Sequence, residues 1–243
     1  MLTRRHLLAG AAALTATPGS TSATHIRIGF VGNSFTLQHN VPEMVRRLLD
    51  SVWFDSFSFN IETFARNGAY LADRKDPQAA LGLARRDSQH FGILVLQDHS
   101  TSALTHVKRT QSLAAIRRFN DLAVNTTLFA TWPRRADHQL YRQPGMPRSA
   151  VDMVEQTEAH LANAMGSETS DERYRIAPVG RAWLLADDID LYAADGYHAN
   201  ISGAWLSALV LARAITGKNV DAVAPKGVKL PDRLAEIARF VVP

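Results

Sequence analysis

The chain of 243 residues contains no cysteine. A disulfide framework, a thiolate zinc cluster and a cysteine nucleophile are therefore excluded. The sequence also lacks the Gly-x-x-x-x-Gly-Lys phosphate loop and the Gly-x-Gly-x-x-Gly dinucleotide motif, so we expect no nucleotide cofactor. Its nine histidines form no His-x-x-x-His pair and no His-Glu cluster, so we expect no metal site. Oxygen nucleophiles and acid–base side chains remain as the candidate chemistry.

The positive charge of the chain is small and dispersed. Lysine and arginine together number 27 and aspartate and glutamate 23, and the arginines are scattered among the acidic residues. A nucleic-acid-binding surface would show a basic stripe, so we expect no nucleic-acid partner. The hydrophobic fraction of 46% is typical of a globular protein, and the length suits a single domain.

The first 23 residues have the three-part pattern of an export signal. Arg4 and Arg5 form a basic segment, an apolar run follows over residues 7–16, and small residues lead to a plausible cleavage site at Ala23. The apolar run is about half of the ~20 residues that a membrane span needs, so we expect no span in the mature protein. Residues 3–8 also resemble the twin-arginine motif. We predict bacterial export, to the periplasm or beyond, and a mature domain over residues 24–243; the alternative is an ordinary N-terminal amphipathic helix.

Short apolar runs alternate with helical patterns along the rest of the chain. This alternation predicts an α/β fold, in which a parallel sheet of five strands is covered by helices on both faces. The predicted strands are Ile26–Val31, Phe57–Phe64, Ile93–Leu96, Thr127–Thr131 and Arg175–Ala177. Helices are predicted from about Asn40 and at Pro77–Asp87, Thr110–Val124, Ala150–Ala164, Ser202–Thr216 and Pro231–Phe240.

Polar residues directly follow several of the predicted strands. Such sheets bind their ligands outside the carboxyl ends of the strands. Ser34 follows the first strand, Gly68 the second and Gln97 the third, while Asp195 and His198 precede the helix that is predicted from Ser202. Each has a plainer interpretation as a turn, cap or packing residue, but their common position at strand ends favours one site.

The spacing of these residues suits nucleophilic catalysis. A serine hydroxyl needs a base to take its proton, and a carboxylate that orients the base improves it. Because Asp195 and His198 are three residues apart, one helical-type turn brings both side chains to the same side. We therefore predict Ser34, Asp195 and His198 as the catalytic residues. The amides of Ser34 and Gly68 and the side chain of Gln97 are the candidate donors of an oxyanion hole.

The segment after the fourth strand is a candidate substrate-binding region. The loop over residues 133–148 is the longest irregular segment of the chain, and such loops are usually functional or mobile. We predict that Trp132, Arg134 and Tyr141 line a substrate cleft. The alternative is a solvated loop with one buried tryptophan.

The sequence resembles the SGNH/GDSL hydrolases, whose marker residues are Ser, Gly, Asn and His. Residues 32–36, Gly-Asn-Ser-Phe-Thr, match the first block, with Asn33 where the family name has Asp. Gly68 matches the second block, Asp195-x-x-His198 matches the last, and the resemblance spans residues 26–217. It implies a flavodoxin-like three-layer sandwich.

The third block departs from the family pattern. Gln97-Asp98-His99-Ser100 replaces the usual Gly-x-Asn-Asp. Carbohydrate-esterase branches of the superfamily use a glutamine near this point, so the resemblance carries the oxyanion role to Gln97. Asp98 and His99 remain alternatives.

The resemblance implies a serine esterase that works through an acyl-enzyme without a cofactor. With the export signal, it suggests removal of a short acyl group from a saccharide or a cell-envelope component. Two alternatives share the fold: an O-acyltransferase that uses the same triad, and a saccharide-binding module without catalysis. Intact Ser34, Asp195 and His198 favour an enzyme over the binding module.

Overall fold

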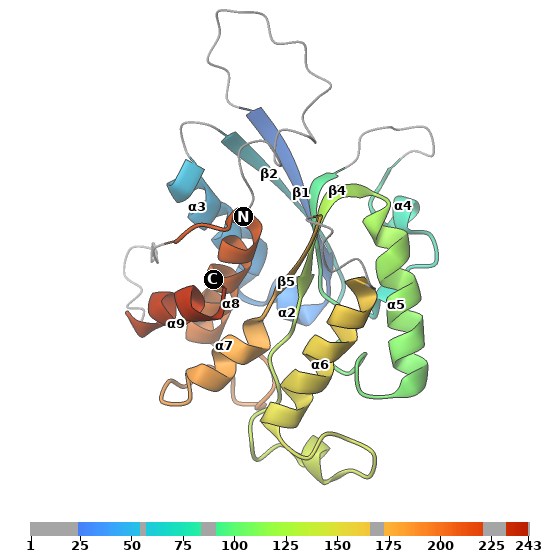
Figure 1. The fold of residues 1–243 in the computed structure, drawn as a ribbon, viewed down its shortest axis with the longest axis vertical. Coiled ribbons are helices and arrows are strands. Elements are labelled where there is room, and N and C mark those ends of the chain that lie inside the picture. The colour runs from blue at the N-terminus through green and yellow to red at the C-terminus, as the bar shows by residue number, and fades with distance from the viewer. Residues whose placement is uncertain (1–23, 54–56, 84–90, 166–172, 221–231, 243) are drawn as a thin grey trace, which may run out of the picture.

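The computed structural model describes residues 24–53, 57–83, 91–165, 173–220 and 232–242. The predicted export signal, residues 1–23, lies outside them. The described chain contains a parallel sheet in the order β2-β1-β3-β4-β5, which confirms the predicted five-stranded α/β sandwich (Figure 1). The strands are β1 (Thr24–Gly32), β2 (Phe57–Ala65), β3 (Phe91–Leu96), β4 (Ala123–Phe129) and β5 (Tyr174–Ala177).

Helices cover both faces of the sheet, as Figure 1 shows. Side chains alternate between the faces along each strand, so Ile28 and Phe30 enter one hydrophobic cluster and Val31 enters the other. The first cluster is closed by α3 (Val41–Trp53), α7 (Val179–Leu185), α8 (Ile201–Thr216) and α9 (Arg233–Val241). The second is closed by α5 (His106–Asn120) and α6 (Ala150–Met165).

Helix α8 anchors the loop that precedes it. Its sequence is apolar on all sides, as expected for a helix that is buried all round, and nearly all of its residues are buried. The Asn200 side chain caps its N-terminus by accepting a hydrogen bond from Gly203 N, and the helix ends at Gly217 in the left-handed conformation. The cap fixes the point at which the loop containing His198 enters the core.

Several predicted boundaries differ from the structure. Helix α5 ends at Asn120, before the predicted Val124, because β4 already begins at Ala123, which pairs with Phe91 of β3. The fourth strand accordingly runs earlier than predicted. Helix α4 (Pro77–Ala80) stops short of the predicted end because Gly82 takes a positive φ of 63°; residues 84–87 of that prediction lie outside the described residues.

Two helices were not predicted. The short α2 (Ser34–Leu37) directly follows β1, and the seven-residue α7 follows β5. Both are too short to show a helical period in the sequence. Within the described segments, no helix is long and apolar enough to cross a membrane.

Candidate active site

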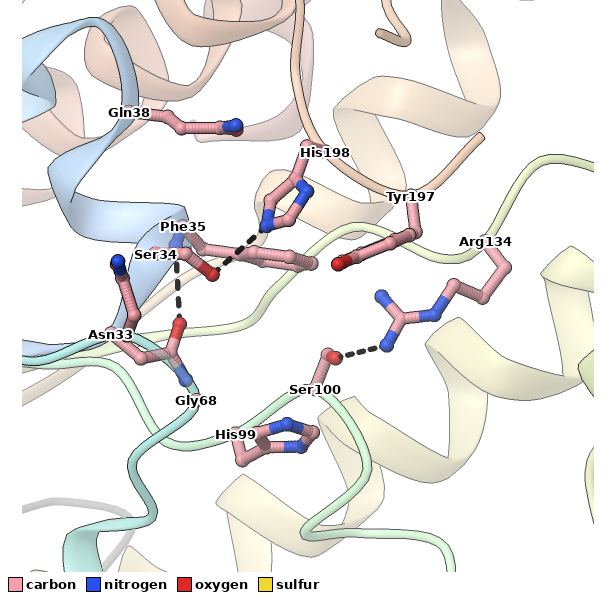
Figure 2. Close-up of a pocket in the computed structure, with 11 residues that line it drawn as sticks. Asn33, Ser34, Phe35, Gln38, Gly68, His99, Ser100, Arg134, Tyr197 and His198 are labelled. Carbon is pink, nitrogen blue, oxygen red and sulfur yellow. Dashed lines mark hydrogen bonds between the residues drawn. The ribbon is translucent and has the colours of Figure 1, made fainter. Parts of the chain in front are cut away.

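A cavity of about 350 Å³ lies at the carboxyl ends of the strands (Figure 2). The loops that follow β1, β2, β3 and β4 contribute to its wall, together with the loop before α8. The cavity therefore occupies the place where a sheet of this type binds its ligands. Its lining residues are Asn33, Ser34, Phe35, Gln38, Asn67, Gly68, His99, Ser100, Arg134, Tyr197 and His198.

A continuous hydrogen-bond chain joins Asp195, His198 and Ser34. His198 Nε2 lies 3.0 Å from Ser34 Oγ (a dashed line in Figure 2 marks this hydrogen bond), and His198 Nδ1 lies 2.7 Å from Asp195 Oδ2. The other carboxylate oxygen accepts hydrogen bonds from the backbone N–H groups of Tyr197 and His198. The structure thus brings together the three residues that the sequence predicts as catalytic.

The electrostatics of Asp195 fix the direction of this chain. Partial burial raises the pKa of the carboxyl, but the His198 and Tyr197 N–H groups and the His198 ring outweigh it and lower the pKa to about 2. An ionised carboxylate can only accept hydrogen bonds. His198 therefore donates through Nδ1 to Asp195, and in the neutral ring Nε2 is left to accept the proton of the Ser34 hydroxyl.

Two backbone amides in the cavity wall are free to donate. Ser34 stands at the start of α2, and Gly68 stands in a turn with a positive φ of 67°, which a residue without Cβ adopts readily. Neither N–H group donates to an acceptor in the described part of the chain. Both amides belong to residues that line the cavity with the Ser34 hydroxyl, which is the arrangement that an oxyanion hole requires.

The chain is similar to solved structures that carry the same fold. One is a protein of Slackia heliotrinireducens that is assigned to the SGNH hydrolases. It is 28% identical, with a TM-score of 0.62, over 80% of this chain and all of the other. The chain belongs to the SGNH hydrolase superfamily. No family model and no curated protein matches the sequence.

Two more distant structures show likeness of fold alone. A DUF4886 family protein from Bacteroides uniformis is 16% identical, with a TM-score of 0.69, and the match covers 90% of this chain and 95% of the other. An acetyl xylan esterase from Geobacillus stearothermophilus is 12% identical, with a TM-score of 0.56, and the match covers 81% and 95% of the two chains.

Gln97 directly follows β3, as predicted, but its side chain does not reach the cavity. The residue is 1% exposed and does not line the cavity. Its Oε1 accepts hydrogen bonds from Asn33 N at 2.9 Å and from Thr36 Oγ1 at 3.0 Å, and its Nε2 donates to the carbonyl of Asp98. Both ends of the amide are therefore engaged within the protein, and this geometry does not support the predicted oxyanion role.

Of the two alternatives in the third block, His99 reaches the cavity and Asp98 does not. Asp98 Oδ1 accepts hydrogen bonds from the N–H groups of Leu71 and His99. The His99 ring stacks on Tyr70 with centroids 4.3 Å apart, and its Nδ1 accepts a hydrogen bond from Thr101 N. Burial lowers the pKa of His99, with a further contribution from the charge of Arg134, which favours the neutral ring. Because Nδ1 accepts from Thr101 N, the proton of that neutral ring belongs on Nε2.

The predicted cleft residues after β4 divide into one that lines the cavity and two that support it. Arg134 lines the cavity. Trp132 is wholly buried in a stack between Phe35 and Trp183, at centroid distances of 4.1 and 4.6 Å. Tyr141 lies behind Arg134 and donates its hydroxyl proton to the Arg134 carbonyl at 2.7 Å. The expectation that Trp132 and Tyr141 contact substrate is therefore not met by this geometry.

The prediction missed six residues of the cavity wall, namely Asn33, Phe35, Gln38, Asn67, Ser100 and Tyr197. Phe35 and Tyr197 lie inside the two sequence blocks that match the SGNH pattern, so their neighbours in the sequence were a usable signal. Gln38 carries no such signal. No cluster of three or more potential metal ligands occurs in the residues that the structure describes.

Proposed function

We propose that this SGNH hydrolase is a serine esterase in which Ser34 is the nucleophile, His198 the general base and Asp195 the residue that orients the base. The observation that carries the proposal is the chain of hydrogen bonds from Asp195 through His198 to Ser34, which ends in a cavity with two free amide donors.

The reaction would proceed through an acyl-enzyme. Ser34 Oγ attacks the ester carbonyl while His198 Nε2 takes its proton. The negative charge on the carbonyl oxygen is then stabilised by the N–H groups of Ser34 and Gly68. We assign a third donor to His99, because its neutral ring has a proton on Nε2 and it lines the cavity. His198 returns the proton to the departing alcohol, and a water molecule hydrolyses the acyl-enzyme by the same steps.

The size of the cavity supports a short acyl group. At about 350 Å³ it is near the lower end of the range for small-molecule sites, roughly 300–1,000 Å³. The fold is shared with an acetyl xylan esterase. Together with the export signal predicted in residues 1–23, these features favour an acylated saccharide or cell-envelope component as substrate. The enzyme would act on it outside the cytoplasm, after export by the twin-arginine route.

Covalent labelling tests the nucleophile. A fluorophosphonate probe is expected to label Ser34, and Ser34→Ala is expected to lower kcat for p-nitrophenyl acetate by about 10⁴–10⁶-fold with the fold retained. Ser100→Ala is a matched control, because Ser100 Oγ lies in the same cavity but contacts Arg134 instead of His198. This variant should still be labelled at Ser34. Labelling of another serine, or full activity of Ser34→Ala, would refute the proposal.

A further inference from the structure

Arg134 places a buried positive charge in the wall of the cavity. Its side chain points into the cavity between Tyr197 and Ser100, as Figure 2 shows, and the residue is 7% exposed. Nη2 donates a hydrogen bond to Ser100 Oγ at 2.9 Å. Nη1 is buried and has no hydrogen-bond partner among the residues that the structure describes.

No described carboxylate forms an ion pair with Arg134. Two aromatic rings lie near the guanidinium, with the Tyr197 centroid 4.7 Å and the Phe35 centroid 5.6 Å from the guanidinium carbon. The carboxylate of Asp195 is already engaged by His198. An arginine keeps its charge in a protein, and a buried charge without a counterion is costly.

The neighbouring arginine shows the contrast. Arg135 is exposed and forms a two-point ion pair with Asp137, at 2.8 and 3.1 Å. Arg134 is thus the buried and unpaired member of two adjacent arginines. Among the residues that line the cavity, it alone carries a permanent charge.

We infer that the substrate carries a carboxylate close to its scissile ester, and that Arg134 binds this group. The inference rests on the proposed esterase function and narrows its substrate class. A guanidinium matches a carboxylate with parallel N–H donors, and such charge-assisted pairs are the stronger hydrogen bonds. The carboxylate can belong to the alcohol, as in an acylated uronic acid, or to the acyl group, as in a half-ester of a dicarboxylic acid.

Two pairs of esters separate these sources. The first pair is an O-acetylated uronic acid and its methyl ester; the second is p-nitrophenyl hemisuccinate and p-nitrophenyl methyl succinate. In one pair, kcat/KM is expected to be about 10–100-fold higher for the anionic member, the gain of one hydrogen-bonded charge pair. Arg134→Gln should abolish this preference, whereas Arg135→Gln, the matched control outside the cavity, should retain it.

Thermal unfolding separates this role from a structural one. Arg134→Met replaces an unpaired charge by an apolar side chain of similar length, so its Tm is expected to equal or exceed that of the wild type. A large drop in Tm in Arg134→Met would mean that the arginine serves the fold, and would overturn the inference. Arg134→Lys keeps the charge without the planar fork, so it is expected to retain a reduced preference for the anionic ester. If Arg134→Gln folds poorly, this variant tests the inference in its place.

The inference and the proposed function fail in different ways. Equal kcat/KM for the anionic and neutral members of both pairs overturns the inference and leaves the esterase in place. An equal loss for both members in Arg134→Gln also overturns it, because the arginine would then act on the common ester group. If no ester is turned over, calorimetric titration of Ser34→Ala with succinate and with galacturonate still decides: binding that Arg134→Gln removes supports the inference, and no binding refutes it.

Discussion

Replacing Gln97 with alanine should destabilise the protein, because the Gln97 side chain satisfies three buried polar groups. These are the backbone N–H of Asn33, the hydroxyl of Thr36 and the carbonyl of Asp98. The side chain is 1% exposed, so bulk water does not reach these groups in the native state. After truncation, each group loses its partner inside the protein.

The magnitude follows from the number of groups left without a partner. A buried donor or acceptor without a partner costs about 1–3 kcal/mol. Three such groups give a loss of about 3 kcal/mol or more in the free energy of unfolding. For a chain of this length, that corresponds to a decrease in Tm of about 6–12 °C.

Urea unfolding of the two proteins, with kcat measured well below both Tm values, checks this reasoning. Gln111→Ala is the matched control, because Gln111 is exposed on α5 and should change stability by less than about 0.5 kcal/mol. An oxyanion donor acts in the transition state and contributes little to folding. The stabilising role of the Gln97 side chain would be refuted by an unchanged free energy of unfolding in Gln97→Ala together with a kcat loss of about 10²–10³-fold.

Two further predictions concern histidines. His99→Phe keeps the aromatic stack on Tyr70 but removes the Nε2 donor, so kcat for p-nitrophenyl acetate should fall about 10²–10³-fold with little change in KM; an unchanged kcat would remove His99 from the oxyanion site. Burial lowers the pKa of His160, so the unfolded chain binds a proton that the folded chain rejects, and stability should fall as pH drops below about 6.5, at most about 1.4 kcal/mol per pH unit for this group. Urea unfolding at pH 7.5 and 5.5 measures the loss in the free energy of unfolding between these two pH values. This loss should be smaller in His160→Gln than in the wild type, but unchanged in His106→Gln, where the histidine is exposed. Equal losses in the wild type and both variants would contradict the argument.

The parallel sheet and the catalytic candidates could be predicted from the sequence, because both depend on local signals. Apolar runs bounded by turn residues mark the strands, and a polar residue directly after such a run must lie at the carboxyl edge of the sheet. Ser34 and Gly68 were found in this way. Asp195 and His198 were found from their spacing, since a turn of three residues places their side chains together.

The local sequence gives no comparable signal for the direction in which a long side chain points. Gln97 follows β3 as predicted, yet its side-chain amide points toward the segment that follows β1, because Asn33 N and Thr36 Oγ1 offer buried donors there. Trp132 also follows its strand as predicted. It is drawn into the core by stacking on Phe35 and Trp183, two residues that are distant from it in the sequence. Such outcomes depend on contacts between different segments of the chain.

The departures from the family pattern in the first and third blocks meet in one set of buried hydrogen bonds. Asn33 Oδ1 accepts a hydrogen bond from Phe35 N, and its Nδ2 donates one to the carbonyl of Ala69, next to Gly68. An aspartate at this position could accept the first bond but could not donate the second while ionised. The N–H of Asn33 in turn donates to Gln97. The side-chain amide of Asn33 therefore links the loop of Ser34 to the loop of Gly68. The side-chain amide of Gln97, which follows β3, holds the backbone of Asn33 in place. Gln97 and Asn33 thus belong to one buried network: the change of Gln97 leaves the Asn33 N–H without its partner, whereas a change of Asn33 to aspartate leaves the Ala69 carbonyl without its donor.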